Sequence, residues 1–293
     1  MTDQPLVSIG VYSYNNSKYL LETLTSIQNQ TYENIELIIV DDCSTDNSVN
    51  IIKDWLANCT KPYKFIIHEK NMGVVHTCNT GIKNASGKYY AGFSTDDIMM
   101  EDKTRIQVEI LENSGEKVGV VYSNAFVINE EGRDMSGKFF DDGPSGNIFL
   151  DLLHHSFIIG FMVKMSVIRD IGLYDTNIGY EDYDMALRIA AKYDFVFSDY
   201  VSLKYRVRDN GLTKSLTNWN YSYLQIFSKH LNHHPAVLTR IEGIFVSGYL
   251  SKQKVTMEYF KRINKKTFKM RLAFLFYRFK IPHLIGKPIL SHL

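Results

Sequence analysis

The fold is decided by residues 35–46, IELIIVDDCSTD, in which an apolar run rich in β-branched residues stops abruptly at two acids. Ile35–Val40 has the length and composition of a buried strand, and Asp41 and Asp42 follow it directly. Ser48–Ala57 then shows a helical pattern. A continuous apolar strand that leads at once into a helix is typical of a parallel sheet covered by helices.

The same unit of a strand followed by a helix recurs on both sides of this stretch. The expected strands are Val7–Val11, Ile35–Val40, Phe65–His68 and Tyr89–Phe93, and the expected helices are Tyr19–Gln30, Ser48–Ala57, Val74–Asn84 and Lys103–Asn113. This alternation predicts an α/β fold with a mostly parallel central sheet flanked by helices. Such sheets bind ligands beyond the carboxyl ends of their strands, so the residues that follow each strand are the first candidates for function.

The second half of the chain is less regular. The expected elements are strands at Val118–Val121 and Ala125–Ile128, a hairpin and loop over Asn129–Gly146, a buried strand at Phe157–Lys164, a helix at Glu181–Lys192, and extended segments at Asp194–Phe197 and Ser202–Val207. Beyond Leu216 the pattern is helical. We therefore expect an α/β domain over residues 1–215, with halves at 1–100 and 101–215, and a helical region over 216–293.

Charge is distributed unevenly along the 293 residues. Residues 251–293 hold eleven Lys or Arg and one acid, which leaves 22 basic and 31 acidic residues in the rest of the chain. The three cysteines are Cys43, Cys59 and Cys78; they are odd in number and form no CxxC pair, so a reducing cytoplasm is the simplest setting. No signal peptide or membrane span is expected, because the longest apolar run, Phe157–Val163, is far shorter than the ~20 residues that cross a bilayer.

An acidic pair follows the expected strand at Tyr89–Phe93. Ser94 and Thr95 lead into Asp96 and Asp97. Neighbouring carboxylates at a strand end point in different directions, so one can bind Mg²⁺ or Mn²⁺ while the other accepts hydrogen bonds from a ribose. The structural alternative is that Asp97 caps the helix that begins near Glu101.

Two further strand ends are polar. After Val40, Asp42 can accept the N–H of a pyrimidine base, while the Ser, Thr and Asp residues that follow can cap the next helix. After Val11, the loop that contains Tyr12 and Tyr14 can hold a base and a ribose, or can be a simple Asn-rich turn.

Three acids lie at the N-terminus of the helix expected at Glu181–Lys192. Glu181, Asp182 and Asp184 can complement the helix dipole, and one of them can instead be a general base that faces a bound substrate. Both roles are compatible if Asp184 serves the helix and Asp182 faces the site.

In this order the motifs resemble those of family 2 glycosyltransferases, which have the GT-A fold. The resemblance covers residues 6–215 and includes the segments 7–15, 26–32, 36–46, 71–73, 79–81, 96–97, 172–175 and 181–184. It implies a Rossmann-like GT-A domain with a nucleotide-sugar-binding half, 1–100, and an acceptor-binding half, 101–215. It also implies that Asp42 contacts uracil, that Asp96 and Asp97 contact ribose and metal, and that Asp182 is the catalytic base, with Glu181 as the second choice. A single base and a single displacement imply inversion at the anomeric carbon.

The sequence departs from the family pattern at several positions. Ser94 replaces a frequent Asp, and Arg208 lies where a His is often found. Arg208 could pair with the diphosphate, or could be a surface residue in a turn. Cys43 stands where Gly or Asn is more usual, and Cys78 where Arg is more usual.

The basic C-terminal region interleaves aromatic residues with Lys and Arg over Phe260–Lys280. This pattern favours contact with an anionic membrane surface, and the alternative is a helical appendage with a solvated basic face. No nucleic-acid-binding motif accompanies the charge, so a nucleic-acid partner is not expected. Of the tandem histidines, His233 and His234 are expected to be solvated or capping residues, and His154 and His155 could also contact the acceptor.

The sequence thus predicts a cytoplasmic, peripheral membrane enzyme that transfers a hexosyl or N-acetylhexosaminyl group. The expected donor is a nucleoside-diphosphate sugar, with UDP preferred, and the expected acceptor is a glycan or lipid-linked glycan of surface polysaccharide synthesis. The alternatives are a nucleotide-sugar-binding module without activity and a nucleotidyltransferase of similar fold. Nucleotidyltransferases usually open with a Gly-rich basic loop, which the segment after Val11 lacks.

Overall fold

The computed structural model describes residues 4–154, 158–208 and 219–292, and these residues form two compact units. The first unit comprises residues 1–152, 156–176 and 181–211, and the second comprises 153–155, 177–180 and 212–293. The expected boundary between residues 215 and 216 lies outside the described residues.

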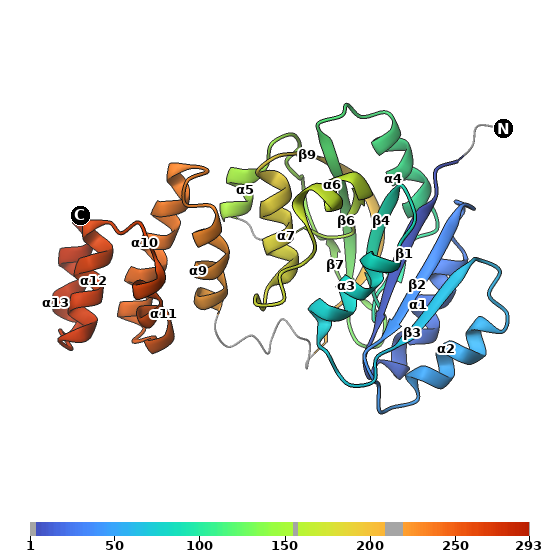
Figure 1. Cartoon of the computed structure of the whole chain (residues 1–293), viewed down its shortest axis with the longest axis horizontal. Helices are drawn as coiled ribbons and strands as arrows, with labels where there is room; N and C mark the ends of the chain where they lie inside the picture. Colours follow the sequence, from blue (N-terminus) through green and yellow to red (C-terminus); the bar gives the residue numbers. More distant parts are fainter. Residues whose placement is uncertain (1–3, 155–157, 209–218, 293) are drawn as a thin grey trace. The chain divides into compact units, whose positions relative to one another are not determined.

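The first unit is built on a nine-stranded sheet (Figure 1). Its path is β3-β2-β1-β4-β8-β6-β9-β5, and β7 pairs with β6 at the side of this path. The strands are β1 Val7–Ser13, β2 Ile35–Asp41, β3 Tyr63–Ile67, β4 Tyr89–Ser94, β5 Ile98–Met99, β6 Val118–Ile128, β7 Asp134–Lys138, β8 Met162–Lys164 and β9 Asp194–Arg206. The first four are parallel, as the sequence predicts, whereas β8 runs antiparallel between β4 and β6.

Helices connect and cover these strands. They are α1 Ser17–Gln28, α2 Ser48–Leu56, α3 Val74–Asn84, α4 Lys103–Glu112, α5 Phe149–His154, α6 Met165–Ile171 and α7 Glu181–Ala190. The predicted helices thus form, within two residues at each end.

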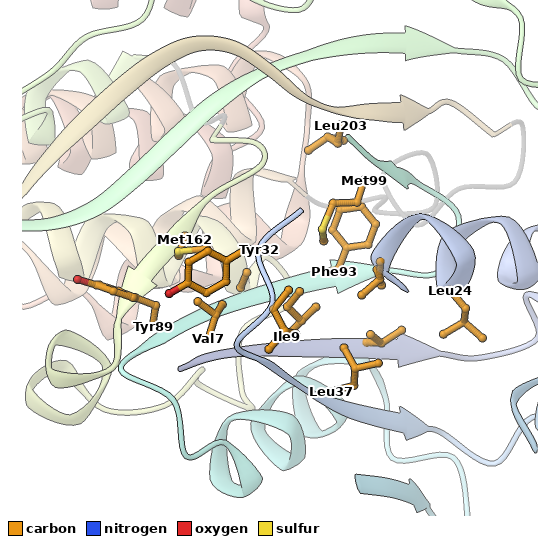
Figure 2. Packing of buried hydrophobic residues seen from close by; sticks show 14 of the residues in the cluster. Val7, Ile9, Leu24, Tyr32, Leu37, Tyr89, Phe93, Met99, Met162 and Leu203 are labelled. Carbon is orange, nitrogen blue, oxygen red and sulfur yellow. The ribbon is translucent and has the colours of Figure 1, made fainter. Parts of the chain in front are cut away.

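The core lies between β1, β2, β4 and α1 (Figure 2). Alternate residues of β1, Val7, Ile9 and Val11, are fully buried on one face of the sheet. Leu20, Leu24 and Ile27 repeat at helical spacing on α1 and join the same cluster. Each such buried side chain contributes roughly 1.5–3 kcal/mol by leaving water.

Polar residues inside long strands make the second half hard to predict. The two short strands expected at 118–128 form the single strand β6, and the two extended segments at 194–207 form β9. Pairing of these two strands shifts register around Asn124. The buried Asn124 side chain accepts from the Phe140 N–H at 2.9 Å and donates to the Phe140 carbonyl at 2.8 Å, so its polarity is satisfied inside the sheet.

The strand expected at Phe157–Lys164 is shorter than predicted. Phe157 lies outside the described residues, and the strand β8 begins only at Met162. Gly160 has φ +59°, in the left-handed region, so the extended conformation is broken there.

The second unit is helical, as predicted. Its helices are α9 Trp219–Lys229, α10 Pro235–Leu250, α11 Lys254–Glu258, the 3₁₀ turn η1 Tyr259–Arg262, α12 Phe268–Arg278 and α13 His283–Ser291. His234 caps α10, because its Nδ1 accepts from the Ala236 N–H at 3.1 Å. Across the parts of the chain that the structure describes, no helix is both long enough and apolar enough to span a bilayer.

Cys43 offers a test of backbone strain. It has φ +62°, a conformation that glycine adopts without a Cβ clash. We expect Cys43→Gly to raise the free energy of unfolding by about 0.5–1 kcal/mol, measured by urea denaturation. Cys59→Gly is the matched control and should destabilise, because Cys59 packs against the core and has no positive φ. A Cys43→Gly variant less stable than wild type would contradict this account.

Candidate active site

Parallel pairing brings three polar strand ends to one edge of the sheet. Ser13 at the end of β1 pairs with Asp41 at the end of β2, and Tyr12 pairs with Ser94 at the end of β4. The loops that follow these strands therefore start side by side.

The loops after β1 and β2 are tied to each other. Asn15, which has φ +48°, accepts from the Thr45 N–H at 2.8 Å. Asp46 accepts from the N–H groups of Ser17 at 3.0 Å and Ser48 at 2.9 Å. Burial alone would raise the pKa of Asp46, but these hydrogen bonds lower it to about 2. The acid-rich run after β2 thus has a structural role in part, as the capping alternative proposes.

Asp42 uses most of its hydrogen-bonding capacity within the protein. Its Oδ1 contacts His68 Nδ1 at 2.7 Å and accepts from the Met72 N–H at 2.8 Å, and its Oδ2 accepts from the Gly73 N–H at 2.8 Å. Burial acts to raise its pKa, but the bonds from His68, Met72 and Gly73 outweigh this effect and lower it. A carboxylate offers about four lone-pair positions, so Oδ2 retains one for an N–H of a ligand.

A cavity of about 360 Å³ adjoins Asp42 through His68 and Met72. It is lined by His68, Glu69, Lys70, Met72, His76 and Thr80. His68 Nε2 contacts the Thr80 hydroxyl at 3.1 Å, so its ring links Asp42 to α3. The volume falls in the range of small-molecule sites, about 300–1,000 Å³.

The acidic pair after β4 divides into one accessible and one buried carboxylate. Asp96 is partly exposed, accepts from the Ser94 hydroxyl, and lies 3.3 Å from Arg208 Nη1. Asp97 is buried, and its Oδ1 accepts from the Arg206 N–H at 2.8 Å. Burial, and then repulsion from Asp96, raises the pKa of Asp97 well above its usual value. The expected helix cap at Asp97 is not formed, because α4 begins after Asp102 and Asp97 bonds to β9 instead.

Arg208 lies next to residues that the sequence predicts to bind the nucleotide sugar. Its Nη1 donates to Asn16 Oδ1 at 2.7 Å as well as contacting Asp96, and its guanidinium lies 5.4 Å from the centre of the Tyr19 ring. It is therefore not an isolated surface arginine.

Arg206 is a residue that sequence reasoning missed. It is 4% exposed, and it donates to the Asp96 carbonyl at 2.8 Å and to Glu22 Oε2 at 2.6 Å. Its own N–H binds Asp97. This arginine fixes the backbone of the acidic loop from the end of β9, and its position two residues before Arg208 on the same extended segment is the only sequence signal for it.

The two tyrosines expected in the donor site lie in different surroundings. Tyr14 is 48% exposed and is free to contact a ligand, whereas the Tyr12 hydroxyl bonds to the Tyr90 hydroxyl below the strand ends. A Cβ on Gly81 would lie 2.8 Å from the Tyr12 ring, and a Cβ on Gly92 would lie 3.2 Å from it. Glycines thus form the slot that holds Tyr12 in the core.

Glu181 and Asp182 begin α7 and lie close together. Asp182 is exposed to solvent, yet surrounding protein desolvates it and raises its pKa, while a hydrogen bond from Tyr174 acts in the opposite direction. Burial, and then repulsion from Asp182, raises the pKa of Glu181 to about 8. Asp182 also raises the pKa of Cys78, so it lies near the α3 residue whose thiol contacts Tyr12.

Asp184 takes the structural role expected of one of the three acids. It is fully buried, and its Oδ2 accepts from Arg188 Nε at 2.8 Å. Of the histidines expected to contact an acceptor, His154 ends α5 and His155 lies outside the described residues.

Few side chains of the site are placed to be ligands of a divalent cation. Among the described residues, no three His, Cys, Asp or Glu side chains gather as a metal site. Mg²⁺ and similar ions often bind one or two carboxylates together with phosphate oxygens and water. Asp96 fits that pattern because it is accessible, whereas the buried Asp97, bonded to a backbone N–H, fits it poorly.

Replacing Glu181 by Gln should change the pH dependence of stability. The folded protein retains the Glu181 proton up to about pH 8, whereas the unfolded chain loses it above about pH 4.5, so wild-type stability declines between these values. We expect the gain in unfolding free energy from Glu181→Gln to be about 1–2 kcal/mol larger at pH 8 than at pH 5, measured by denaturant unfolding. Glu33→Gln, at an exposed site, is the control. Equal gains at both pH values would contradict a raised pKa for Glu181 in the folded protein.

Comparison with known proteins agrees with this geometry. The family model described as Glycosyl transferase family 2 matches residues 8–171. An uncharacterized glycosyltransferase of Rickettsia typhi is 31% identical over 253 residues, which cover 84% of this chain and 77% of the relative. An uncharacterized glycosyltransferase of Methanocaldococcus jannaschii is 32% identical over 232 residues, which cover 75% of this chain and 78% of the relative.

Two solved structures share the fold. The structure of S. aureus TarS 1–349 in complex with UDP-GlcNAc matches with a TM-score of 0.63 and 16% identity, over 93% of this chain and 79% of that one. The mannosyltransferase PcManGT from Pyrobaculum calidifontis, in complex with GDP-Man and Mn²⁺, matches with a TM-score of 0.65 and 17% identity, over 98% and 87% of the two chains. The family match spans the strand ends after β1, β2 and β4, and the chain belongs to glycosyltransferase family 2 and has the GT-A fold.

Proposed function

We propose that this glycosyltransferase moves a hexosyl or N-acetylhexosaminyl group from a nucleoside diphosphate to a hydroxyl group, with inversion at the anomeric carbon. The observation that carries the proposal is Asp182, an exposed carboxylate in the first turn of α7 whose charge acts on Cys78 of α3. UDP is the preferred nucleotide because of the sequence resemblance. TarS has been solved with UDP-GlcNAc and PcManGT with GDP-Man, so both nucleotides belong in the test.

The strand ends supply the donor site in this proposal. Asp42 offers its remaining lone pair to an N–H of the base, beside the cavity lined by His68 and Met72. Tyr14 is exposed and can stack on the base or ribose. Arg208 can exchange its contact with Asp96 for the phosphate oxygens, which a guanidinium binds in a bidentate manner.

Asp96 is the residue that would hold a divalent cation together with the diphosphate. Such a cation neutralises the charge that develops on the diphosphate as it leaves. We propose that Asp97 supports the loop through its bond to the Arg206 N–H. In this proposal it does not bind the metal, which is the role expected from the sequence.

Asp182 is the base in this proposal. The acceptor oxygen forms a bond to the anomeric carbon from the face opposite the diphosphate, and the bond from that carbon to the diphosphate oxygen breaks, with its electron pair leaving on the diphosphate. The acceptor proton passes to the Asp182 carboxylate. Its raised pKa increases its proton affinity near neutral pH, which favours general-base catalysis.

Two variants should separate binding from chemistry. Asp96→Asn should weaken Mn²⁺-dependent binding of UDP or GDP by roughly tenfold or more, measured by calorimetry, because a charged ligand to the cation is lost. Asp182→Asn should bind the same nucleotide as wild type does, but release it from UDP-GlcNAc or GDP-mannose roughly 10²–10⁴-fold more slowly, because the proton acceptor is missing.

Asp170→Asn is the matched control, since Asp170 is a surface carboxylate paired with Lys192. It should leave both binding and turnover unchanged. Wild-type binding without any turnover on either donor would favour the binding module without activity. Full turnover in Asp182→Asn would remove Asp182 as the base.

We further propose that the acceptor is a glycan or lipid-linked glycan of surface polysaccharide synthesis and that the second unit contacts a membrane surface on the cytoplasmic side. Phe268 and Leu275 of α12 and Phe279, which caps its C-terminus, are exposed and spaced seven and four residues apart, so they lie on one face. Arg271 and Arg278 flank this face. On α13, the exposed apolar residues are Leu284, Ile285 and Ile289. Apolar side chains among basic ones suit an anionic bilayer surface.

Vesicle binding tests the membrane contact. Phe279→Ser combined with Leu284→Ser should reduce co-sedimentation with vesicles of phosphatidylglycerol and phosphatidylcholine by roughly tenfold or more, because two exposed apolar side chains no longer enter the lipid. Leu21→Ser, at an exposed leucine of α1, is the control and should bind as wild type does. If wild-type protein does not bind, or if all three proteins bind equally, the membrane contact is wrong.

A further inference from the structure

A buried side chain of α3 holds the backbone of a residue 95 positions away. The Asn79 amide donates from Nδ2 to the Tyr174 carbonyl at 2.9 Å, and its Oδ1 accepts from the Tyr174 N–H at 3.0 Å. Both residues are buried. One amide side chain therefore satisfies both backbone groups of Tyr174, as a paired strand would, and fixes that residue against α3.

The side chain of Tyr174 contacts the proposed base. Burial raises the pKa of the Asp182 carboxyl, and the Tyr174 side chain lowers it by hydrogen bonding to the ionised carboxylate. The pKa of Tyr174 is itself raised well above its usual value, first by burial and then by the charge of Asp182. The hydroxyl thus keeps its proton over the physiological range and remains a donor.

A second set of contacts fixes the segment before Tyr174. Arg188 of α7 donates to the carbonyls of Ile171 and Leu173, each at 2.8 Å, and pairs with Asp184 at 2.8 Å. Since Asp184 lies two residues after Asp182 on α7, the same helix carries the base and anchors the segment that reaches Tyr174. Tyr174 is thereby held by Asn79 of α3, and the residues just before it are held by Arg188 of α7.

The groups that face Asp182 leave Tyr174 as its main stabilising contact. Glu181 on the same helix repels it, and the buried Cys78 of α3, whose thiol contacts Tyr12, lies near it. Burial is the largest influence on the Asp182 carboxylate, and the Tyr174 hydroxyl is the contact that opposes it.

We propose that Asn79 and Tyr174 are positioning residues for the base: Asn79 clamps the Tyr174 backbone to the donor half, and the Tyr174 hydroxyl orients the Asp182 carboxylate toward the acceptor hydroxyl. This inference rests on the proposed function of Asp182. It makes the orientation of the base depend on α3, the helix whose first residues follow the loop that contacts Asp42.

The sharpest test is Tyr174→Phe, which removes one oxygen atom and keeps the ring. Without the hydroxyl the ionised carboxylate is less stable, so the pKa of Asp182 should rise by about one unit. The measurement is ¹³C NMR titration of the aspartate carboxyl carbons in the full chain, with the Asp182 signal assigned by its loss in Asp182→Asn. Tyr32→Phe is the control, because it also removes a buried hydroxyl, which donates to the Pro5 carbonyl. It should leave the Asp182 titration unchanged.

Kinetics give a second readout. On UDP-GlcNAc or GDP-mannose, whichever donor wild type uses, Tyr174→Phe should lower kcat roughly 10-fold to 100-fold with little change in KM, and should move the acid limb of the pH profile to higher pH. Asn79→Ala should lower kcat in the same way, whereas Asn84→Ala on the same helix should not, since Asn84 bonds only to the Thr80 carbonyl of its own helix through its side chain. If the Asn79→Ala variant does not fold, the measurements on Tyr174→Phe alone test the proposal.

The outcomes separate this inference from the proposed function. An unchanged Asp182 titration and an unchanged kcat in Tyr174→Phe would overturn the positioning role while Asp182→Asn remains inactive. Full activity in Asp182→Asn would instead overturn the base assignment, whatever Tyr174→Phe does.

Discussion

The parallel pairing of β1 with β2 on one side and β4 on the other is the constraint on which the site depends. It aligns the ends of three strands within one register, so that Asn15, Asp42 and Asp96 follow neighbouring positions of the sheet. The pairing is stable because β2 is buried on both faces and α1 covers the core with a helical stripe. A shift of one residue in β1 would turn its buried residues to the opposite face, so the hydrophobic pattern and the site geometry are specified together.

The first half of the fold could be predicted from sequence because its signals are local. Apolar strands, helical periods and acids after strands each lie within one short segment, and the predicted helix over Val74–Asn84 matches α3. The second half could not be read in the same way. The strand β6 contains Asn124, whose buried amide bonds to Phe140, and β8 is cut short at Gly160 by a positive φ. A polar residue inside a strand can be predicted to be buried there only once its hydrogen-bond partner is known.

The same distinction applies to the site. Asp96 and Asp182 were predicted because their residue types and order match a family pattern, and Arg208 because it stands where that pattern often has His; the structure brings Arg208 to Asp96. The different surroundings of Asp96 and Asp97 could not be read from an acidic pair, since they depend on a backbone N–H of Arg206 more than 100 positions away. Arg206 and Asn79 were missed for the same reason: each acts on backbone groups that are distant in sequence.

The division of the chain into two units does not follow the order of the sequence. The second unit is not a simple C-terminal extension, because it includes residues 177–180, which lie between Tyr174 and Asp182 in the chain. Within that unit the Tyr180 ring packs 6.1 Å from the Tyr223 ring, and Gln225 donates to the Asn177 carbonyl at 3.2 Å. A recombination event that replaced only the residues after 211 would separate these partners and disturb the segment that leads into α7. Transplanting a different C-terminal unit between relatives would therefore require residues 177–180 to move with it.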